Sequence, residues 1–171
     1  MDINSVAEMI NNIATNFEKS IEDCLANNSL VITAMIKEQL YSGMNGKEQY
    51  LSPTYDDDPF FEQEGYWYHR NKQYKNFKKM ITPPESGTIL GLPPRPENIP
   101  NLKITGFFYS EINAERMDGG LRINEGEILG SDLVSKYGEE IIMLSPTAIR
   151  YFNENYTRQA IEELYRASDY L

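Results

Sequence analysis

The stretch Met117-Asp118-Gly119-Gly120 decides the class of fold that we expect for this chain. An Asp-Gly pair favours the tight turn of a hairpin, because these residues tolerate positive φ angles. The segment Leu121-Arg122-Ile123 follows at once, and its alternation is typical of a half-buried return strand. Residues 113 to 116 can supply the partner strand. The sequence therefore predicts a small antiparallel sheet within an α+β fold.

Three further elements are predicted around this hairpin. Leu102 to Glu111 is rich in Ile, Thr, Phe and Tyr, and this composition favours a strand. Ser131 to Tyr137 has the pattern of a short helix, with Ser131 as its N-cap and Gly138 as its end. The apolar run from Ile141 to Leu144 is typical of a short buried strand.

Residues 1 to 42 are predicted to be helical. Ser5 and Glu8 have the spacing of a capping box, and Gly43 is suited to end the helix. The polar triplet from Asn27 to Ser29 indicates either a turn or a kink. Apolar residues recur at spacings of three and four and so share one face of the first helix: Val6, Met9, Ile10, Ile13, Phe17, Ile21, Cys24 and Leu25.

A second long helix is predicted at the other end of the chain. Ser145 followed by Pro146 has the form of an N-cap and a first helical residue. Asn153-Glu154-Asn155 is expected to bend the helix. Because the hairpin lies between the two helical ends, we expect the sheet to pack on them in a single domain of 171 residues, with residues 101–171 holding the sheet and the last helix.

The middle of the chain, residues 43–100, has another character. Pro and Gly recur with little sustained periodicity, apart from a predicted short helix over residues 70–81. Irregular segments of this length are usually functional loops or linkers, and the many aromatic residues favour a loop that docks on a partner. We therefore expect an extended arm, whose deletion leaves a folded domain.

The composition limits the partners of the protein. The net charge of -10 disfavours binding to duplex DNA or to anionic membranes. The one cysteine, Cys24, rules out a disulfide within the chain. No basic secretion signal opens the sequence, and the longest apolar run, from Leu30 to Ile36, is too short to span a bilayer. We expect a soluble protein that is made in a reducing compartment, without a membrane partner.

Residues for chemistry are scarce. A lone histidine, His69, and a lone cysteine cannot build the usual zinc sites, and no catalytic triad can be argued from them. Asp56-Asp57-Asp58 is followed by Pro59 and lacks the ligand spacing of a calcium loop. We therefore predict no catalytic residues, no metal and no cofactor, and a protein that is not an enzyme.

The strongest candidate site is a charged and aromatic part of the arm. Opposite charges along one segment suit contacts between neighbouring copies, whereas basic and aromatic residues together over residues 66–79 are also typical of single-stranded nucleic-acid binding. The first interpretation is preferred, with a nucleic-acid-binding accessory protein as the alternative. The predicted contact residues are Asp56, Asp57, Asp58, Tyr66, Trp67, Tyr68, Arg70, Lys72, Lys75, Lys78 and Lys79.

The order of elements resembles the tail-completion, or head-to-tail joining, family of tailed bacteriophages. The resemblance rests on the first predicted strand from Leu102 to Tyr109, on the helix end Ser135-Lys136-Tyr137-Gly138, and on the helix entry Leu144-Ser145-Pro146. The stretches from Glu38 to Gly43 and from Lys103 to Tyr109 also look like structural proteins of crAss-like phages of gut Bacteroidales. The middle segment is longer than the loop usual in the family.

The resemblance implies a structural virion protein, assembled in the host cytoplasm, that forms a homo-oligomeric ring in the neck or tail. Its implied neighbours are portal, adaptor and tail proteins, and DNA would at most pass through the channel. Twelve copies are expected if the ring lies close to the portal.

Overall fold

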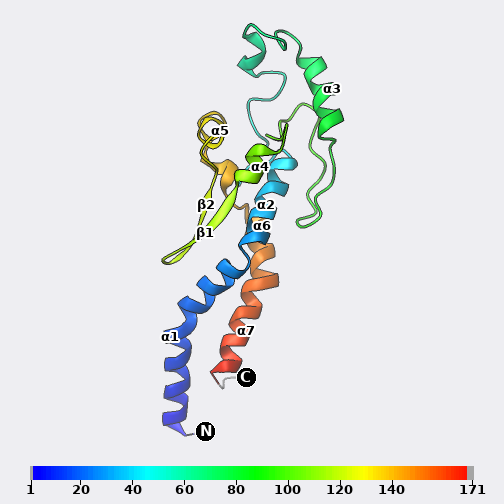
Figure 1. Ribbon diagram of the computed structural model, residues 1–171. Coiled ribbons are helices and arrows are strands. Elements are labelled where there is room, and N and C mark those ends of the chain that lie inside the picture. The colour runs from blue at the N-terminus through cyan, green and yellow to red at the C-terminus, as the bar shows by residue number, and fades with distance from the viewer. Residues whose placement is uncertain (1, 169–171) are drawn as a thin grey trace.

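The computed structural model describes residues 2–168, so the expected domain boundaries at residues 1 and 171 lie outside the described part. The molecule is elongated: a head of loops and short helices sits on two long helical segments that run side by side (Figure 1). The long terminal helices and the two-stranded antiparallel sheet confirm the predicted α+β class.

The N-terminal helical region contains a kink, which is one of the two predicted alternatives, and not a turn between separate helices. Helix α1 (Ile3–Asn27) and helix α2 (Ser29–Tyr41) meet at Asn28. The predicted cap at Ser5 is wrong, because the Asp2 carboxylate accepts from the backbone N–H groups of Asn4 and Ser5, both at 2.9 Å. A carboxylate is favoured at this end of a helix by the helix dipole. Gly43 follows α2 with φ of 72°, which confirms the predicted stop.

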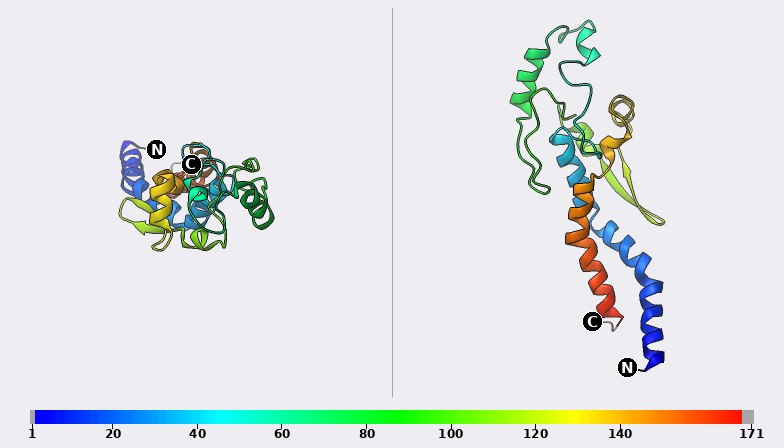
Figure 2. Two further views of the ribbon diagram at one scale, coloured as in Figure 1. Left: turned by 90° about the horizontal axis from the view of Figure 1, so that it is seen from above. Right: turned by 180° about the vertical axis from the view of Figure 1, so that it is seen from behind.

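The C-terminal region is a nearly continuous helix. It comprises α6 (Pro146–Phe152), the π-helical turn η3 (Asn153–Thr157) and α7 (Arg158–Ala167). The Ser145 hydroxyl accepts from Ala148 N at 3.2 Å, which confirms the predicted cap. The π turn lies where a bend was predicted. Helix α7 packs along the C-terminal half of α1 (Figures 1 and 2).

The predicted hairpin is confirmed. Strand β1 (Asn113–Met117) pairs antiparallel with β2 (Gly120–Asn124), and Met117 faces Gly120 across the two-residue turn. The sheet lies against α1 and α2. Two contacts fix its tip to α1: Gly119 N donates to Glu22 at 3.1 Å, and Arg116 lies 2.7 Å from an Asp23 carboxylate oxygen.

The strand predicted at Leu102 to Glu111 is wrong. The chain forms an irregular segment and then helix α4 (Phe107–Glu111). Gly106 takes φ of 87°, and the Thr105 hydroxyl accepts from Phe107 N at 3.3 Å. The adjacent residues Phe108 and Tyr109 are both buried, which a strand with one solvent-facing side does not allow.

The strand predicted at Ile141 to Leu144 is also wrong, because this segment forms the 3₁₀ helix η2 (Glu139–Ile142) and an extended exit. The buried side chain of Gln39 forms the hydrogen bonds to this backbone that a neighbouring strand would form in a sheet. It donates to Met143 O at 3.0 Å and accepts from Ser145 N at 2.9 Å. Helix packing therefore overrides the local strand preference.

The predicted short helix before η2 is present as α5 (Gly130–Tyr137), and it ends at Gly138 as expected. Its predicted cap is wrong. The helix begins one residue before Ser131, and the N-cap position, Leu129, offers no side-chain hydrogen bond.

The middle segment is loop-rich but folds back on its own chain, with the 3₁₀ helix η1 (Pro59–Glu62) and helix α3 (Asn71–Ile81) at the top of Figure 1. Leu51, Tyr55, Phe61 and Ile99 are buried. The Glu38 carboxylate on α2 accepts from three successive backbone N–H groups, at residues 88 to 90, over distances of 2.7 to 3.0 Å. This part of the chain thus belongs to the folded body.

Candidate functional site

The acidic part of the candidate site is largely paired within the chain. Asp56 lies 2.6 Å from the Lys75 ammonium on α3. Asp57 accepts from the Thr54 hydroxyl at 2.9 Å. The carboxylates therefore hold their own loop in shape.

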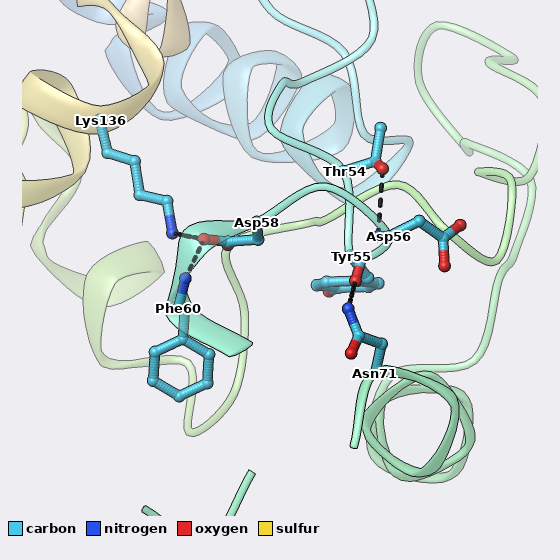
Figure 3. A network of polar contacts seen from close by, with 7 residues as sticks. All are labelled: Thr54, Tyr55, Asp56, Asp58, Phe60, Asn71 and Lys136. Carbon is cyan, nitrogen blue, oxygen red and sulfur yellow. Dashed lines mark hydrogen bonds and ion pairs between the residues drawn. The ribbon is translucent and has the colours of Figure 1, made fainter. Parts of the chain in front are cut away.

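Asp58 is buried and joins distant parts of the chain. Its two carboxylate oxygens accept from the Lys136 ammonium at 2.8 and 2.6 Å, and one of them also accepts from Phe60 N at 3.0 Å. Figure 3 shows Lys136 reaching from α5 toward this carboxylate. Asp58 followed by Pro59 is a strong helix start, so the local sequence explains the cap. The ion pair with Lys136 was not predicted.

Aromatic rings form the centre of the head. The Tyr74 ring lies 5.0 to 5.2 Å, between centroids, from three others, those of Tyr55, Phe61 and Trp67. These edge-to-face pairs stabilise the junction of η1 and α3. Phe77, half-buried on α3, continues the cluster beside Trp67. Trp67 is thus half-buried in its own chain, whereas Tyr66 and Tyr68 remain exposed.

The basic residues of α3 and of its N-cap position, Arg70, divide into paired, buried and free groups. Lys75 and Lys79 form ion pairs with Asp56 and Glu97. Arg70 lies over the Tyr66 ring at 5.1 Å. Among residues 2–168, Lys72 has no ion-pair partner. Only Arg70 and Lys72 of the five predicted cations are therefore available for a partner's anionic groups.

Lys78 is the fifth of these cations, and it is almost fully buried, with 1% of its surface exposed. Its ammonium donates to the carbonyl oxygen of Lys103. Burial lowers the pKa of Lys78 to about 7, and the nearby cations Arg95 and Lys103 act in the same direction. Lys78 is therefore a structural residue of the head rather than a surface contact.

A cavity of about 340 Å³ lies beside Lys78, between η1, α3, α4 and α5. Its wall is mainly apolar and aromatic, and it also contains five charged residues: Asp58, Lys78, Lys103, Asp132 and Lys136. A cavity of this size and character suits a small apolar group. Lys136 pairs with Asp58 and Lys78 donates to a backbone carbonyl, so these three charges stabilise the wall.

Neither of the two reactive side chains of the sequence, His69 and Cys24, lines this cavity. His69 is exposed and lies 3.5 Å from Glu62. Cys24 is buried on α1, and burial raises the pKa of its thiol. Within residues 2–168, no group of three or more His, Cys, Asp and Glu side chains is arranged to hold a metal ion. In the same range, no helix has the length and apolar character needed to cross a membrane.

Two apolar surfaces outside the predicted site are more prominent. The first, here called the α1 stripe, comprises Ile3, Val6, Ile10, Ile13 and Phe17, of which Ile3, Ile10 and Phe17 are 84%, 58% and 42% exposed. The second, here called the β-side groove, is an apolar hollow of about 650 Å³ between the hairpin, η2 and α6. Met143 and Ile149 are exposed at its edge. Periodicity marked the α1 stripe in the sequence, but it could not show which part stays uncovered.

Comparison of the chain with protein-family models, with curated protein sequences and with solved structures found no match.

Proposed function

We propose that this protein is a non-enzymatic structural subunit of a tailed bacteriophage virion. It forms an oligomeric ring in the neck or tail that joins the portal or adaptor to the tail. The observation that carries the oligomer is the presence of two separate uncovered apolar surfaces, the α1 stripe and the β-side groove, whereas the place in a virion rests on the resemblance of the sequence. Exposed apolar surface of this kind is typical of protein–protein contacts.

Two different surfaces favour a ring over a simple dimer. A two-fold dimer uses one self-complementary patch, whereas a ring of three or more copies gives each subunit a contact on both sides. In the proposed ring, the β-side groove receives apolar side chains of a neighbouring copy. The structure of a single chain does not give the number of copies in the ring. For a ring next to the portal, we propose twelve.

The charged segment has a smaller role in this proposal than its sequence indicates. Three ion pairs within the chain, Lys75–Asp56, Lys79–Glu97 and Lys136–Asp58, use most of the charges that could have bound a neighbour. The exposed residues left for contact with an adjacent ring are Tyr66, Tyr68, Arg70 and Lys72.

The same pairing weakens the alternative of a nucleic-acid-binding protein. Only Arg70 and Lys72 remain available for phosphates, beside an acidic loop that repels them. Trp67, the natural stacking platform, is half-buried among Tyr66, Tyr74 and Phe77. We therefore propose that DNA at most passes through the ring without being gripped.

The test is the mass of the purified full-length chain, measured by native mass spectrometry and sedimentation. We expect a closed oligomer of at least three copies. The groove variant Ile149→Asp should lower the mass, because it places a charge in an apolar contact. Asn153→Asp, one turn further along the exposed helix face, is the matched control and should leave the mass unchanged. A wild-type chain that stays monomeric at high concentration would exclude the ring.

A further inference from the structure

The N-terminal half of α1 projects beyond the rest of the molecule. The hollow between α1 and α7 is lined on α1 by residues from Asn16 onward and on α7 by residues up to its end at Ala167. Residues 3 to 15 line no part of this hollow, and they form a helical segment about 20 Å long at 1.5 Å per residue. Figure 2 shows this end of α1 lying apart from the body of the chain.

This projecting segment is a poor helix on its own. It is rich in Asn, Ser, Thr and β-branched residues, which rank low in intrinsic helix propensity. It is the free end of the 25-residue helix α1, and most of the stability of a helix in a protein comes from packing of its apolar face. A partner that covers the apolar face would therefore stabilise this end of α1.

The α1 stripe has the spacing of a coiled-coil seam. Its members follow one another at intervals of three, four, three and four residues. In heptad terms, Ile3, Ile10 and Phe17 take the a positions, and Val6 and Ile13 take the d positions. Such a seam is matched by another helix with the same repeat, and Ile at both a and d favours assemblies of more than two strands.

The stripe is also wider than the seam of a two-stranded coil. The e positions are occupied by Ala7, Ala14 and Ile21, so three of every seven residues are apolar. A face of this width suits a helix that is flanked by two others. The small Ala side chains allow close approach of the second neighbour.

Charge also permits a second copy of this acidic chain to occupy the stripe. Residues 3 to 18 hold two charged side chains, Glu8 and Glu18, which fall on the f and b positions away from the seam. The a, d, e and g positions from Ile3 to Phe17 carry no charge. The repulsion expected between two chains of net charge -10 is therefore absent at this contact.

We propose that residues 3–21 of α1 pack against the same segment of the two neighbouring copies, with all helices parallel, and so form a helical collar at one end of the oligomer. The collar rests on the proposed ring and names the surface that joins its subunits. Parallel packing follows from the ring, because rotation about a single axis keeps all copies of a helix in the same direction.

The first test compares two single substitutions in the full-length chain. Ile10→Asp places a charge at an a position, and we expect it to weaken association at least about 100-fold, because the carboxylate would be buried without a partner. Asn12→Asp adds the same charge at a c position and should leave the mass of the oligomer unchanged. Ile10 is more than half exposed in the single chain, so both variants should fold.

The second test measures direction. Ile3→Cys should form a disulfide between copies at least about ten times faster than Asn4→Cys, because residues at a positions face one another across a parallel seam, whereas Asn4 lies at a b position that points away from it. An antiparallel pair would separate the two Ile3 positions by most of the length of the segment, and the absence of the cross-link would overturn the collar. The wild-type chain, with its buried Cys24, is the background control.

The two proposals fail in different ways. If Ile10→Asp keeps the wild-type mass, the collar is wrong and the ring stands on other contacts. If the wild-type chain is monomeric, both the ring and the collar are wrong.

Discussion

The Lys136 ammonium on α5 lies 2.6 Å from Oδ2 and 2.8 Å from Oδ1 of Asp58, a residue 78 positions earlier in the chain. This ion pair joins α5, which follows the hairpin in the chain, to the loop that leads into η1. The same carboxylate accepts from Phe60 N, so one side chain both begins a helix and fixes a long-range contact.

Replacing Asp58 should separate these two roles. Asp58→Asn keeps an oxygen for Phe60 N but removes the charge, and we expect a loss of about 1 kcal/mol in the free energy of unfolding, since the lysine is partly exposed. Asp58→Ala removes the cap as well and should cost about 2 kcal/mol. Urea denaturation measures both values. Asp57→Asn is the control, and an equal loss there would mean that the buried ion pair adds nothing.

The Glu38 carboxylate supplies the second long-range contact that can be tested. It accepts from Thr88 N, Ile89 N and Leu90 N, and Gly87 packs so closely that an added Cβ would lie 2.0 Å from its oxygen. Glu38→Gln turns one acceptor into a donor that faces backbone N–H groups. We expect about 1–3 kcal/mol of destabilisation and faster hydrogen exchange at residues 88–90. Glu18→Gln, on the exposed face of α1, should change neither quantity.

Local signals in the sequence were sufficient for the terminal helices and the hairpin. Ser145-Pro146 and the Asp118-Gly119 turn act through neighbouring residues, so short windows of sequence contain the required information. The strands predicted at Leu102–Glu111 and Ile141–Leu144 failed for the opposite reason. Their conformation depends on Gln39 and on the burial of adjacent aromatic rings, which are contacts with distant parts of the chain.

The candidate site was predictable only in part. Its residues are brought into one region of the head, but the sequence could not show that Lys78 is buried or that Asp58 is paired with Lys136. Charge runs reveal where charges lie along the chain, whereas partners such as Glu97 and Lys136 come from outside the run. The contacts between copies therefore stay a prediction, whereas the ion pairs observed in this region lie within one chain.

Deleting the middle segment tests whether it is an arm or part of the body. The extended-arm interpretation predicts that removal of residues 46–98 leaves a folded domain. The buried side chains of Leu51, Tyr55 and Phe61 lead us to expect the reverse, because each large buried side chain contributes about 1.5–3 kcal/mol of burial. Circular dichroism and thermal unfolding should show loss of the cooperative transition. If the deletion variant unfolds as cooperatively as the full chain, the extended-arm interpretation is correct.

The buried Lys78 should make stability depend on pH. Its pKa falls from 10.5 in the unfolded chain to about 7 in the folded protein. Between these values the unfolded chain binds a proton that the folded chain lacks, so the free energy of unfolding should rise with pH from about 7 upward. Below pH 7 Lys78 is protonated in both the folded and the unfolded state. The cost of burying its charge is then fully present, and the free energy of unfolding no longer changes with pH because of Lys78. We expect Lys78 to raise the free energy of unfolding by up to about 1.4 kcal/mol per pH unit between pH 8 and 9.

Lys78→Met isolates this contribution. Met has a similar length and no charge, so the variant should lose the slope between pH 7 and 9 and be more stable than the wild type at pH 6. Measurements should stop near pH 9, because burial raises the pKa of Tyr74, and buried phenols oppose the trend once the unfolded tyrosines ionise near pH 10. The matched control is Lys72→Met on the exposed face of α3, which should keep the wild-type slope. If Lys78→Met and the wild type show parallel pH profiles, Lys78 does not bury its charge in the folded state.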